Sequence, residues 1–253
     1  TGNQIGSLLT DYVIRKAQEA GQLTPQHYVV QTLVTTRLLG RIARKAGVRV
    51  IDDLMVGFKW IGGVMDYEGP DRFLIGAEES YGFLIGDHAR DKDGAVAAMV
   101  LCELAAELKA RGQTLVGRLE ELFREHGLHE EMAFSIDLPG ERGMQLMKDL
   151  MQKFRTNPPK ELGGQRVVSV HDLNQPIGVD PSQEWEYAMA AARRGNVVLL
   201  HLDETGDNRV AIRPSGTEPK CKFYVFGYLP PSALGDLHQA RDNLQRQLKL
   251  IAE

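Results

Sequence analysis

Cysteine and long apolar runs are scarce in this chain of 253 residues, and each shortage excludes a class of protein. Only two cysteines occur, Cys102 and Cys221, far apart and in apolar surroundings. They exclude a disulfide framework and predict two buried thiols in a reducing compartment. No apolar run approaches the roughly 18 residues that a membrane-spanning helix needs. These absences favour a cytoplasmic protein with no membrane partner.

An excess of positive charge is also absent. Thirty lysines and arginines face 34 aspartates and glutamates, so the formal net charge is −4. Without a basic stripe, nothing supports nucleic-acid binding. Seven histidines occur, but they form no metal-binding pattern. His126 and His129 are three residues apart with no further cluster of ligands beside them, so we expect no metal site in this chain.

The chain has enough length and apolar material for two domains, with 43% hydrophobic residues. Its first half alternates short β-rich runs with helical periodicity, which predicts an α/β domain with a mainly parallel mixed sheet. The expected helices cover residues 5–20, 36–47, 58–65 and 94–111, and the expected strands 27–34, 48–51 and 72–76. In the last of these helices, we expect the buried stripe to consist of Ala98, Met99, Cys102, Ala105 and Leu108.

The second half has a different pattern, which predicts an α+β domain with an antiparallel sheet. The expected strands cover residues 134–138, 167–170, 197–202, 209–213 and 221–226, and the expected helices 141–154 and 231–251. Because periodicity breaks near residues 126–131, we expect two domains that cover residues 1–127 and 128–253.

The strongest local signal is the segment from Arg213 to Lys220, which lies between two expected strands. Arg213 can donate two parallel hydrogen bonds to phosphate oxygens, and Ser215 and Thr217 supply hydroxyl donors. Gly216 lets the backbone turn so that successive N–H groups point at one anion. The pattern therefore favours a phosphate-binding loop. A polar hairpin tip of ordinary turn residues is the alternative.

A second polar cluster, Glu78, Glu79 and Ser80, directly follows an expected strand. Carboxylates and a serine can bind sugar hydroxyls, although a solvated loop explains the same residues. Lys92 lies at a helix start, where a cation opposes the helix dipole unless it faces an anion. Lys59 interrupts an apolar stretch. Solvated or snorkelling lysines are the alternative for both.

Five segments in this order resemble the α-D-phosphohexomutase superfamily, and the bacterial phosphoglucomutases and related phosphopentomutases in particular. They are Thr1-Gly2-Asn3-Gln4, Gly57-Phe58-Lys59-Trp60-Ile61, Glu78-Glu79-Ser80-Tyr81-Gly82, Arg90-Asp91-Lys92-Asp93 and Arg213 through Lys220. The resemblance covers nearly the whole chain. It implies the third domain of the family, which recognises the sugar, followed by the fourth, a phosphate-binding domain with a TATA-binding-protein-like fold.

The resemblance also implies a role for each matched residue. Glu78 and Ser80 match the residues that bind two sugar hydroxyls, and Lys59 matches a substrate-contacting loop. The distal phosphate loop is matched by Arg213, Ser215, Gly216 and Thr217. Lys92 matches a lysine near the reacting groups that is proposed to assist proton transfer.

Other parts of the family's machinery have no match in this sequence. No Thr-Ala-Ser-His motif carries a phosphoserine here, and no Asp-x-Asp-x-Asp motif binds magnesium. Because the chain opens at Thr1 without methionine, we expect a cut polypeptide whose catalytic N-terminal domains are missing. The resemblance implies that the intact parent uses magnesium and a hexose 1,6-bisphosphate to interconvert hexose 1-phosphate and hexose 6-phosphate, and that this chain alone is inactive. A stand-alone sugar-phosphate-binding or regulatory module, or a parent that acts on mannose or pentose phosphates, is the alternative.

Overall fold

A computed structural model of the chain describes residues 1–216 and 218–253. The chain divides into two compact units. The first unit comprises Thr1–Gly127 and Val179–Arg193, and the second comprises Leu128–Gly178 and Arg194–Glu253. The chain thus changes unit between Gly127 and Leu128, within the region where periodicity breaks, but residues 179–193 return to the first unit. None of the described helices is long and apolar enough to cross a membrane.

A four-stranded sheet in the order β2-β1-β3-β4 forms the centre of the first unit. Its strands are β1 (Tyr28–Thr32), β2 (Arg49–Leu54), β3 (Phe73–Glu78) and β4 (Gly82–Ile85). β1 pairs in parallel with both β2 and β3, while β4 is antiparallel to β3. All residues of β1 and β3 are buried, as expected for strands covered on both faces. The mainly parallel mixed sheet predicted from the sequence is confirmed.

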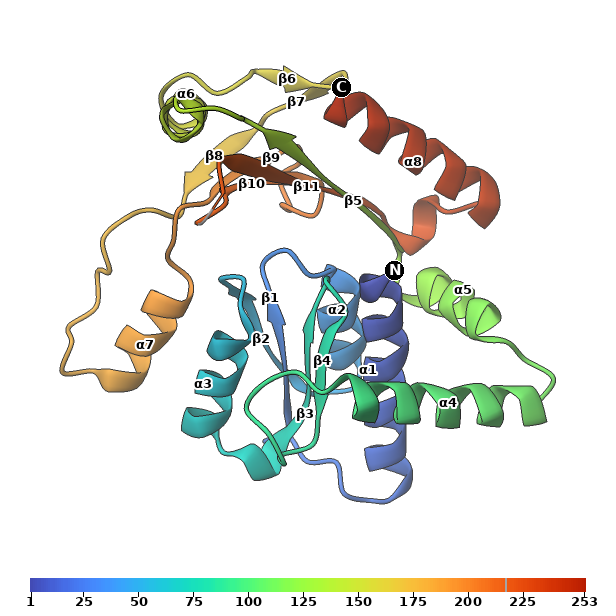
Figure 1. Ribbon diagram of the computed structural model, residues 1–253. Coiled ribbons are helices and arrows are strands. Elements are labelled where there is room, and N and C mark those ends of the chain that lie inside the picture. The colour runs from blue at the N-terminus through green and yellow to red at the C-terminus, as the bar shows by residue number, and fades with distance from the viewer. Residues whose placement is uncertain (217) are drawn as a thin grey trace. The chain divides into compact units, whose positions relative to one another are not determined.

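Helices cover both faces of this sheet (Figure 1). α1 (Gly2–Glu19) and α2 (Arg37–Lys45) lie on one face, and α3 (Phe58–Glu68) lies on the other. α4 (Gly94–Ala110) and α5 (Leu115–His126) follow β4. Thr1 caps α1 through a capping box with Gln4, which the sequence analysis missed when it began this helix at residue 5.

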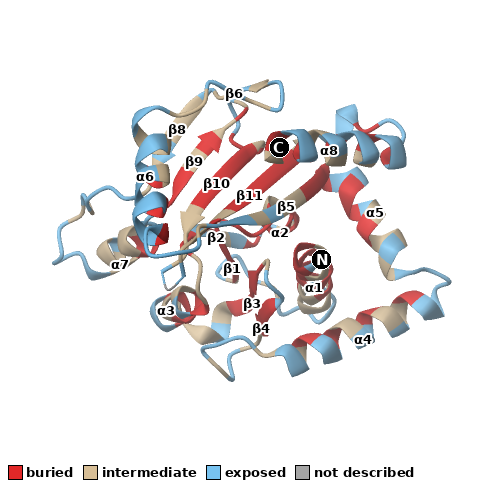
Figure 2. Cartoon of the chain, turned by 45° about the horizontal axis from the view of Figure 1, so that its top comes forward, coloured by how far each residue is buried: buried red, intermediate tan, exposed pale blue. Residues whose placement is uncertain are grey.

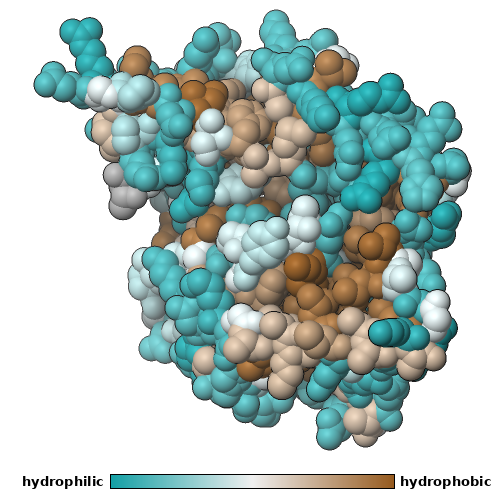
Figure 3. All heavy atoms as spheres, turned by 45° about the vertical axis from the view of Figure 1, so that its right-hand side comes forward, coloured by the Kyte–Doolittle hydropathy of each residue, from teal (hydrophilic) through white to brown (hydrophobic). Residues whose placement is uncertain are grey.

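The exposed face of α4 differs from the expected one. The buried residues are Ala97, Val100, Leu104 and Leu108, whereas Met99 is 57% exposed and Cys102 is exposed. The prediction of a buried stripe was wrong for Ala98, Met99 and Cys102. The prediction of a buried thiol was wrong for Cys102 but is confirmed for Cys221. Because α4 is apolar around most of its circumference, periodicity alone cannot select its buried side. Apolar atoms accordingly reach the surface on the side of the first unit shown in Figure 3.

The segment 179–193 contributes α7 (Glu184–Ala192) to the first unit. Met189 and Ala192 join the cluster of buried residues between α3 and the sheet, and the rings of Trp185 and Tyr67 are 5.0 Å apart. The amide of Met55 donates a hydrogen bond of 2.7 Å to the carbonyl of Ala192. α7 is therefore fixed by side-chain packing and by a backbone bond beside the end of β2.

The second unit is a five-stranded antiparallel sheet in the order β5-β11-β10-β9-β8. The strands are β5 (Leu128–Asp137), β8 (Ser169–Asp172), β9 (Val198–His201), β10 (Arg209–Pro214) and β11 (Lys220–Leu229). A short hairpin pairs β6 (Glu161–Leu162) with β7 (Gln165–Arg166), and a turn of 3-10 helix covers Pro231–Ala233. The predicted antiparallel α+β fold is confirmed.

α6 (Gly143–Thr156) and α8 (Leu237–Ala252) cover one face of the second sheet. Met151 and Leu248 pack there against the alternating inward residues of β9, β10 and β11, which Figure 2 shows as a continuous buried area. Because side chains alternate along a strand, the residues between these inward positions point to the opposite face. Arg213 on β10 and Lys222 on β11 belong to that second set.

Candidate functional site

The carboxylate of Glu78 is held at the end of β3. Its side chain is only 5% exposed, and its Oε1 accepts a hydrogen bond of 2.7 Å from the backbone N–H of Gly57. Gly57 immediately precedes α3 and has a φ of 129°, a conformation that favours glycine. The bond satisfies one of the unpaired N–H groups at the start of the helix. This hydrogen bond joins the segments around Gly57 and Glu78, and it holds the carboxylate in place.

Lys92 lies beside this carboxylate across Gly82. A Cβ atom added at Gly82 would be 3.2 Å from Oε2 of Glu78 and 3.3 Å from Cδ of Lys92. The ammonium of Lys92 is 3.0 Å from Asp91 and 6.0 Å from the ring centroid of Phe58. Hydrogen bonds from Lys92 lower the pKa of Asp91. Glycine at position 82 therefore leaves room for a cation and a carboxylate side by side.

The turn between β3 and β4 presents Ser80 and Tyr81 to solvent. Ser80 is exposed, and Tyr81 is 62% exposed with a φ of 64°. A positive φ is uncommon for a residue other than glycine and often marks a functional turn. The turn lies against the start of α1, because a Cβ atom at Gly2 would be only 2.0 Å from the carbonyl oxygen of Glu79. Glu78, Ser80 and Lys92 thus lie on adjoining segments of one surface.

Asp93 anchors the segment that carries Lys92. Its Oδ1 accepts hydrogen bonds from Ala95 and Val96 at the start of α4, and its Oδ2 is 3.0 Å from His88. The bonds from Val96 and His88 lower the pKa of Asp93. Its amide donates to the carbonyl of Phe83 on β4. Lys92 is therefore held in register with the strand that follows the Glu78 turn.

Lys59 has a different setting. It is exposed on α3, with its ammonium 4.7 Å from the ring centroid of Trp60, and it lines a cavity formed by α3 and α7. None of the described contacts joins Lys59 to Glu78. Of the four residues predicted in the first unit, the structure brings Glu78, Ser80 and Lys92 together. Lys59 lies two residues after Gly57, and a Cβ atom at Gly57 would be 3.9 Å from its Cγ.

Arg213 is the last residue but one of β10, where the predicted phosphate loop begins. Among the described residues, its guanidinium has no hydrogen-bond or ion-pair partner. Lys222 lies directly opposite on β11, on the same face of the sheet. Like charges in such a pair are destabilising unless an anion or solvent separates them. The sequence analysis missed Lys222, although alternation after the buried Cys221 was a signal that it points to the same side as Arg213.

The loop itself is a tight connection. The amide of Ser215 donates to the carbonyl of Lys220 at 2.8 Å, and the amide of Glu218 donates to the hydroxyl of Ser215 at 3.2 Å. Lys220 forms an ion pair with Glu218, which lowers the pKa of Glu218. Gly216 is exposed, and a Cβ atom there would meet nothing within 4 Å. Thr217, the remaining predicted residue of this loop, lies outside the described residues.

Comparison with known proteins separates the same two parts of the chain, although the second match begins within α7 of the first unit. The family profile "Phosphoglucomutase/phosphomannomutase, alpha/beta/alpha domain III" matches residues 1–126, and the profile "Phosphoglucomutase/phosphomannomutase, C-terminal domain" matches residues 188–244. The chain belongs to the phosphoglucomutase/phosphomannomutase family. The resemblance inferred from five short segments is thereby confirmed.

Curated and solved relatives agree with this family membership. A phosphoglucomutase of Staphylococcus aureus (strain USA300) is 34% identical over 227 residues, which cover 88% of this chain and 39% of the relative. The chain thus spans about two fifths of the length of the curated relatives it matches. The phosphoglucomutase pp63/parafusin from Paramecium, in an open form, aligns with a TM-score of 0.57 and 17% identity over 98% of this chain and 42% of its own. A phosphoglucomutase/phosphomannomutase family protein from Burkholderia thailandensis gives 0.52 and 15% over 96% and 41%. The last two likenesses show the fold.

The family implies magnesium, which would need a cluster of ligands. The described residues contain no group of three or more His, Cys, Asp or Glu side chains that could hold a metal ion. The described residues of this chain therefore do not fit the ion.

Proposed function

We propose that this chain supplies the sugar-binding and distal phosphate-binding parts of an enzyme that interconverts hexose 1-phosphate and hexose 6-phosphate. The observation that carries the proposal is the cross-strand pair of Arg213 and Lys222, next to the hydroxyl of Ser215. Among the described residues, Arg213 has no hydrogen-bond or ion-pair partner. Two cations in one cross-strand pair are stabilised by a dianion between or above them. A phosphate ester is the ligand that best fits this arrangement.

The first unit supplies groups that suit the sugar. Glu78 is an acceptor whose position is fixed by the Gly57 N–H, and Ser80 is an exposed hydroxyl that both donates and accepts. Hydroxyl recognition of this kind tolerates a sugar in two pseudo-symmetric orientations. A mutase needs both orientations, because each of the two phosphates must react in turn. Lys59, through its ammonium, is proposed as a further substrate contact.

Lys92 is proposed to assist proton transfer. Its stem lies beside Glu78, and its ammonium pairs with the exposed Asp91. A lysine in this position can hold or pass a proton at the hydroxyl that accepts the phosphoryl group. The family implies a phosphoserine, magnesium and a hexose 1,6-bisphosphate intermediate for the complete reaction. We propose that the additional domains of the longer relatives supply the phosphoserine and magnesium, and that the protein acts in the cytoplasm.

Turnover and binding measurements test this proposal together. In a coupled assay with glucose 1-phosphate, magnesium and a trace of the bisphosphate, we expect no turnover by the chain alone. Rates from about 1 per second upward, ordinary for enzymes, would contradict this expectation. In calorimetry, glucose 6-phosphate should bind at roughly millimolar affinity, or about −4 kcal/mol, and glucose should not bind measurably. If ribose 5-phosphate binds more tightly than glucose 1-phosphate and glucose 6-phosphate do, a pentose phosphate substrate is favoured instead.

A further inference from the structure

The hairpin between β3 and β4 has an unusual residue in its turn. Because Glu78 pairs with Gly82, the turn consists of Glu79, Ser80 and Tyr81. The third residue of such a turn commonly adopts a left-handed backbone conformation, for which glycine is the usual residue. Here the third residue is Tyr81, with a φ of 64°. A bulky side chain at a positive φ costs stability, and residues strained in this way cluster at functional sites.

Surrounding atoms hold the backbone of Tyr81 in this conformation. A Cβ atom at Gly2 of α1 would be only 2.9 Å from the amide nitrogen of Tyr81. Gly82 belongs to β4, and a Cβ atom there would be 3.2 Å from Oε2 of Glu78 and 3.3 Å from Cδ of Lys92. The glycine that follows the turn therefore admits these two side chains, and it does not take the strained position of Tyr81.

The side chain of Tyr81 makes no polar or ring contact that would offset this strain. It is 62% exposed. Within the described part of the chain, it takes part in no hydrogen bond, ion pair or ring contact. A single exposed aromatic residue is ordinary on a protein surface, but here the exposure is combined with a strained backbone. The stability of the fold therefore does not account for a tyrosine at this position.

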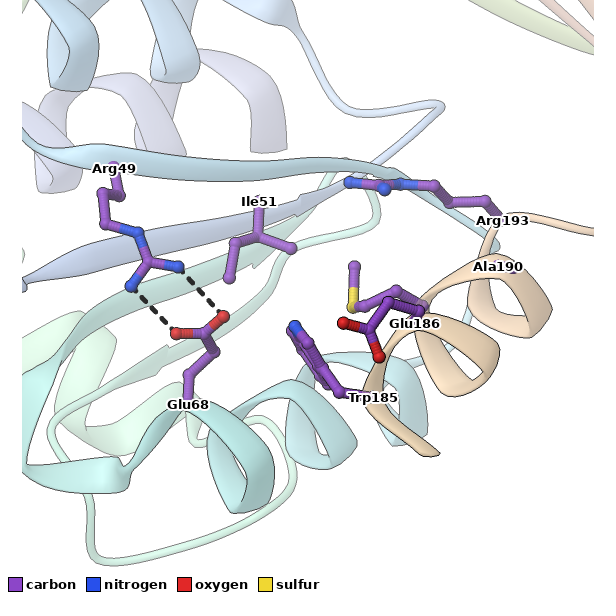
Figure 4. A pocket seen from close by; sticks show the side chains of 8 residues that line it. Arg49, Ile51, Glu68, Trp185, Glu186, Ala190 and Arg193 are labelled. Carbon is purple, nitrogen blue, oxygen red and sulfur yellow. Dashed lines mark hydrogen bonds and ion pairs between the residues drawn. The ribbon is translucent and has the colours of Figure 1, made fainter. Parts of the chain in front are cut away.

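Tyr67 provides a contrast. Among the described residues, Tyr67 and Tyr81 are the two exposed aromatic side chains. The ring centroid of Tyr67 is 5.0 Å from that of Trp185. Trp185 in turn lines a pocket beside the ion pair of Arg49 and Glu68 (Figure 4). Tyr67 thus contributes to the packing of α3 against α7, whereas Tyr81 packs against no other described ring.

The exposed ring adjoins the two groups that are proposed to bind sugar hydroxyls. Ser80 immediately precedes Tyr81 and is exposed as well, and Glu78 is the residue before the turn. A hexose in its ring form has hydroxyls around its rim and C–H groups on its two faces. The face of an aromatic ring carries partial negative charge, so it packs favourably on C–H groups. Polar groups for the rim and an aromatic ring for a face together match one sugar.

We infer that the ring of Tyr81 packs on the C–H face of the hexose and sets the preference of the site between hexoses. The inference rests on the proposed function and deepens it, because it names a further residue of the sugar site and the sugar that this residue favours. Away from its anomeric carbon, glucose has only equatorial substituents, so both of its faces consist of C–H groups. Mannose has an axial hydroxyl at C2, which projects from one face. A sugar that turns over between the two orientations of a mutase presents each face to Tyr81 in turn, so glucose is favoured over mannose.

Three variants at position 81 separate the ring from the backbone. Tyr81→Phe keeps the ring and is the matched control. Tyr81→Asn removes the ring, and asparagine tolerates a left-handed backbone. Tyr81→Gly removes the ring and relieves the strain. Both variants without the ring should unfold at or above the melting temperature of the parent, so weaker binding in them does not reflect a folding defect.

NMR titrations of the chain measure the contribution of the ring. Tyr81→Phe should bind glucose 6-phosphate as the parent does, whereas Tyr81→Asn and Tyr81→Gly should bind it about fivefold more weakly, as expected for the loss of one aromatic contact. When the aromatic protons of the protein are saturated, transfer to the ring protons of the sugar should be stronger in the parent and in Tyr81→Phe than in Tyr81→Asn. Inorganic phosphate should bind all four proteins alike.

Mannose phosphates test the preference between hexoses. Mannose 1-phosphate and mannose 6-phosphate bind in opposite orientations when the same loop holds their phosphate, so the axial hydroxyl meets Tyr81 in one of the two. Relative to the matching glucose phosphate, one of them should therefore bind the parent more weakly. This difference should disappear in Tyr81→Asn.

Two results would overturn the inference and leave the proposed function intact. The first is equal affinity of the parent and Tyr81→Asn for glucose 6-phosphate. The second is an equal loss of affinity in Tyr81→Phe and Tyr81→Asn, which would assign the contact to the hydroxyl instead of the ring. If the parent binds inorganic phosphate but glucose 6-phosphate no more tightly, the proposed sugar site fails, and the inference fails with it.

Discussion

Replacing Gly2 with alanine should disturb the turn at Glu79–Tyr81, which is proposed to bind the sugar. Gly2 is the first residue of α1, and an added Cβ atom would lie 2.0 Å from the carbonyl oxygen of Glu79 and 2.9 Å from the amide of Tyr81. Both are backbone atoms, which cannot rotate away as a side chain does. Ordinary contact begins near 3.4 Å, so the turn or the helix must move by about 1.4 Å.

The helix itself is not free to make this movement. Asn3, the next residue of α1, is buried, and its Oδ1 accepts a hydrogen bond of 3.0 Å from the amide of Thr36. Ser7 then binds the carbonyl of Asn3. The displacement must therefore fall largely on Glu79–Tyr81. Inserting a methyl group into a packed site of this kind costs roughly 1–3 kcal/mol, which corresponds to a melting temperature lower by about 4–8 °C for a cost near 2 kcal/mol.

The matched control is Gly94→Ala. Gly94 is also the first residue of a helix, α4, and a Cβ atom there meets nothing within 4 Å. We expect the control to unfold at or slightly above the parent's temperature, because alanine loses less backbone entropy than glycine. In calorimetric titrations, Gly2→Ala should weaken binding of glucose 6-phosphate and leave binding of inorganic phosphate unchanged. If Gly2→Ala has the same melting temperature as Gly94→Ala and binds glucose 6-phosphate as the parent does, the close contact between α1 and the turn does not exist.

Two further predictions concern single side chains. In the native chain, Ellman's reagent should titrate one thiol rapidly, that of the exposed Cys102, because Cys221 is fully buried and burial raises its pKa to about 11. Denaturant should release the second thiol, and rapid reaction of both in native buffer would contradict the structure. Burial lowers the pKa of His126 below its ordinary value of 6.5, despite the opposing charge of Glu125. The unfolded chain therefore binds the proton more readily, so the free energy of unfolding should fall as pH drops below about 6.5 and level off below the folded-state pKa. A urea series from pH 8 to pH 5 on the parent and on His126→Gln checks this, since the variant should lose part of that slope.

Much of the fold follows from local sequence signals. Strand–helix alternation in the first half and the hairpin around Arg213 were sufficient to predict the two sheet types. Two elements were missed although a signal was present. Thr114 caps α5, and Leu119, Leu122 and Phe123 give it a helical spacing. The short run from Gly82, which forms β4, was not separated from the preceding turn.

Other features depend on tertiary contacts that no local pattern contains. The sequence of α7 is rich in alanine, and it is placed in the first unit by tertiary contacts such as that of Trp185 with Tyr67 and the bond from Met55 to Ala192. The pairing of Arg213 with Lys222 depends on the register between β10 and β11. The bond from Gly57 to Glu78 joins segments 21 residues apart. The candidate residues could thus be found from the sequence, but not the groups that position them.

The most direct test of the proposed function compares Arg213→Ala with Glu78→Ala in calorimetric or NMR titrations. Arg213 is proposed to bind a phosphate dianion, whereas Glu78 is proposed to bind neutral hydroxyls. Arg213→Ala should therefore abolish binding of both inorganic phosphate and glucose 6-phosphate, because each charge-assisted hydrogen bond contributes roughly 1.5–3 kcal/mol. Glu78→Ala should weaken binding of glucose 6-phosphate and leave inorganic phosphate nearly unaffected. If Arg213→Ala binds phosphate as well as the parent chain does, the segment from Arg213 to Lys220 is an ordinary hairpin tip and the proposed function fails.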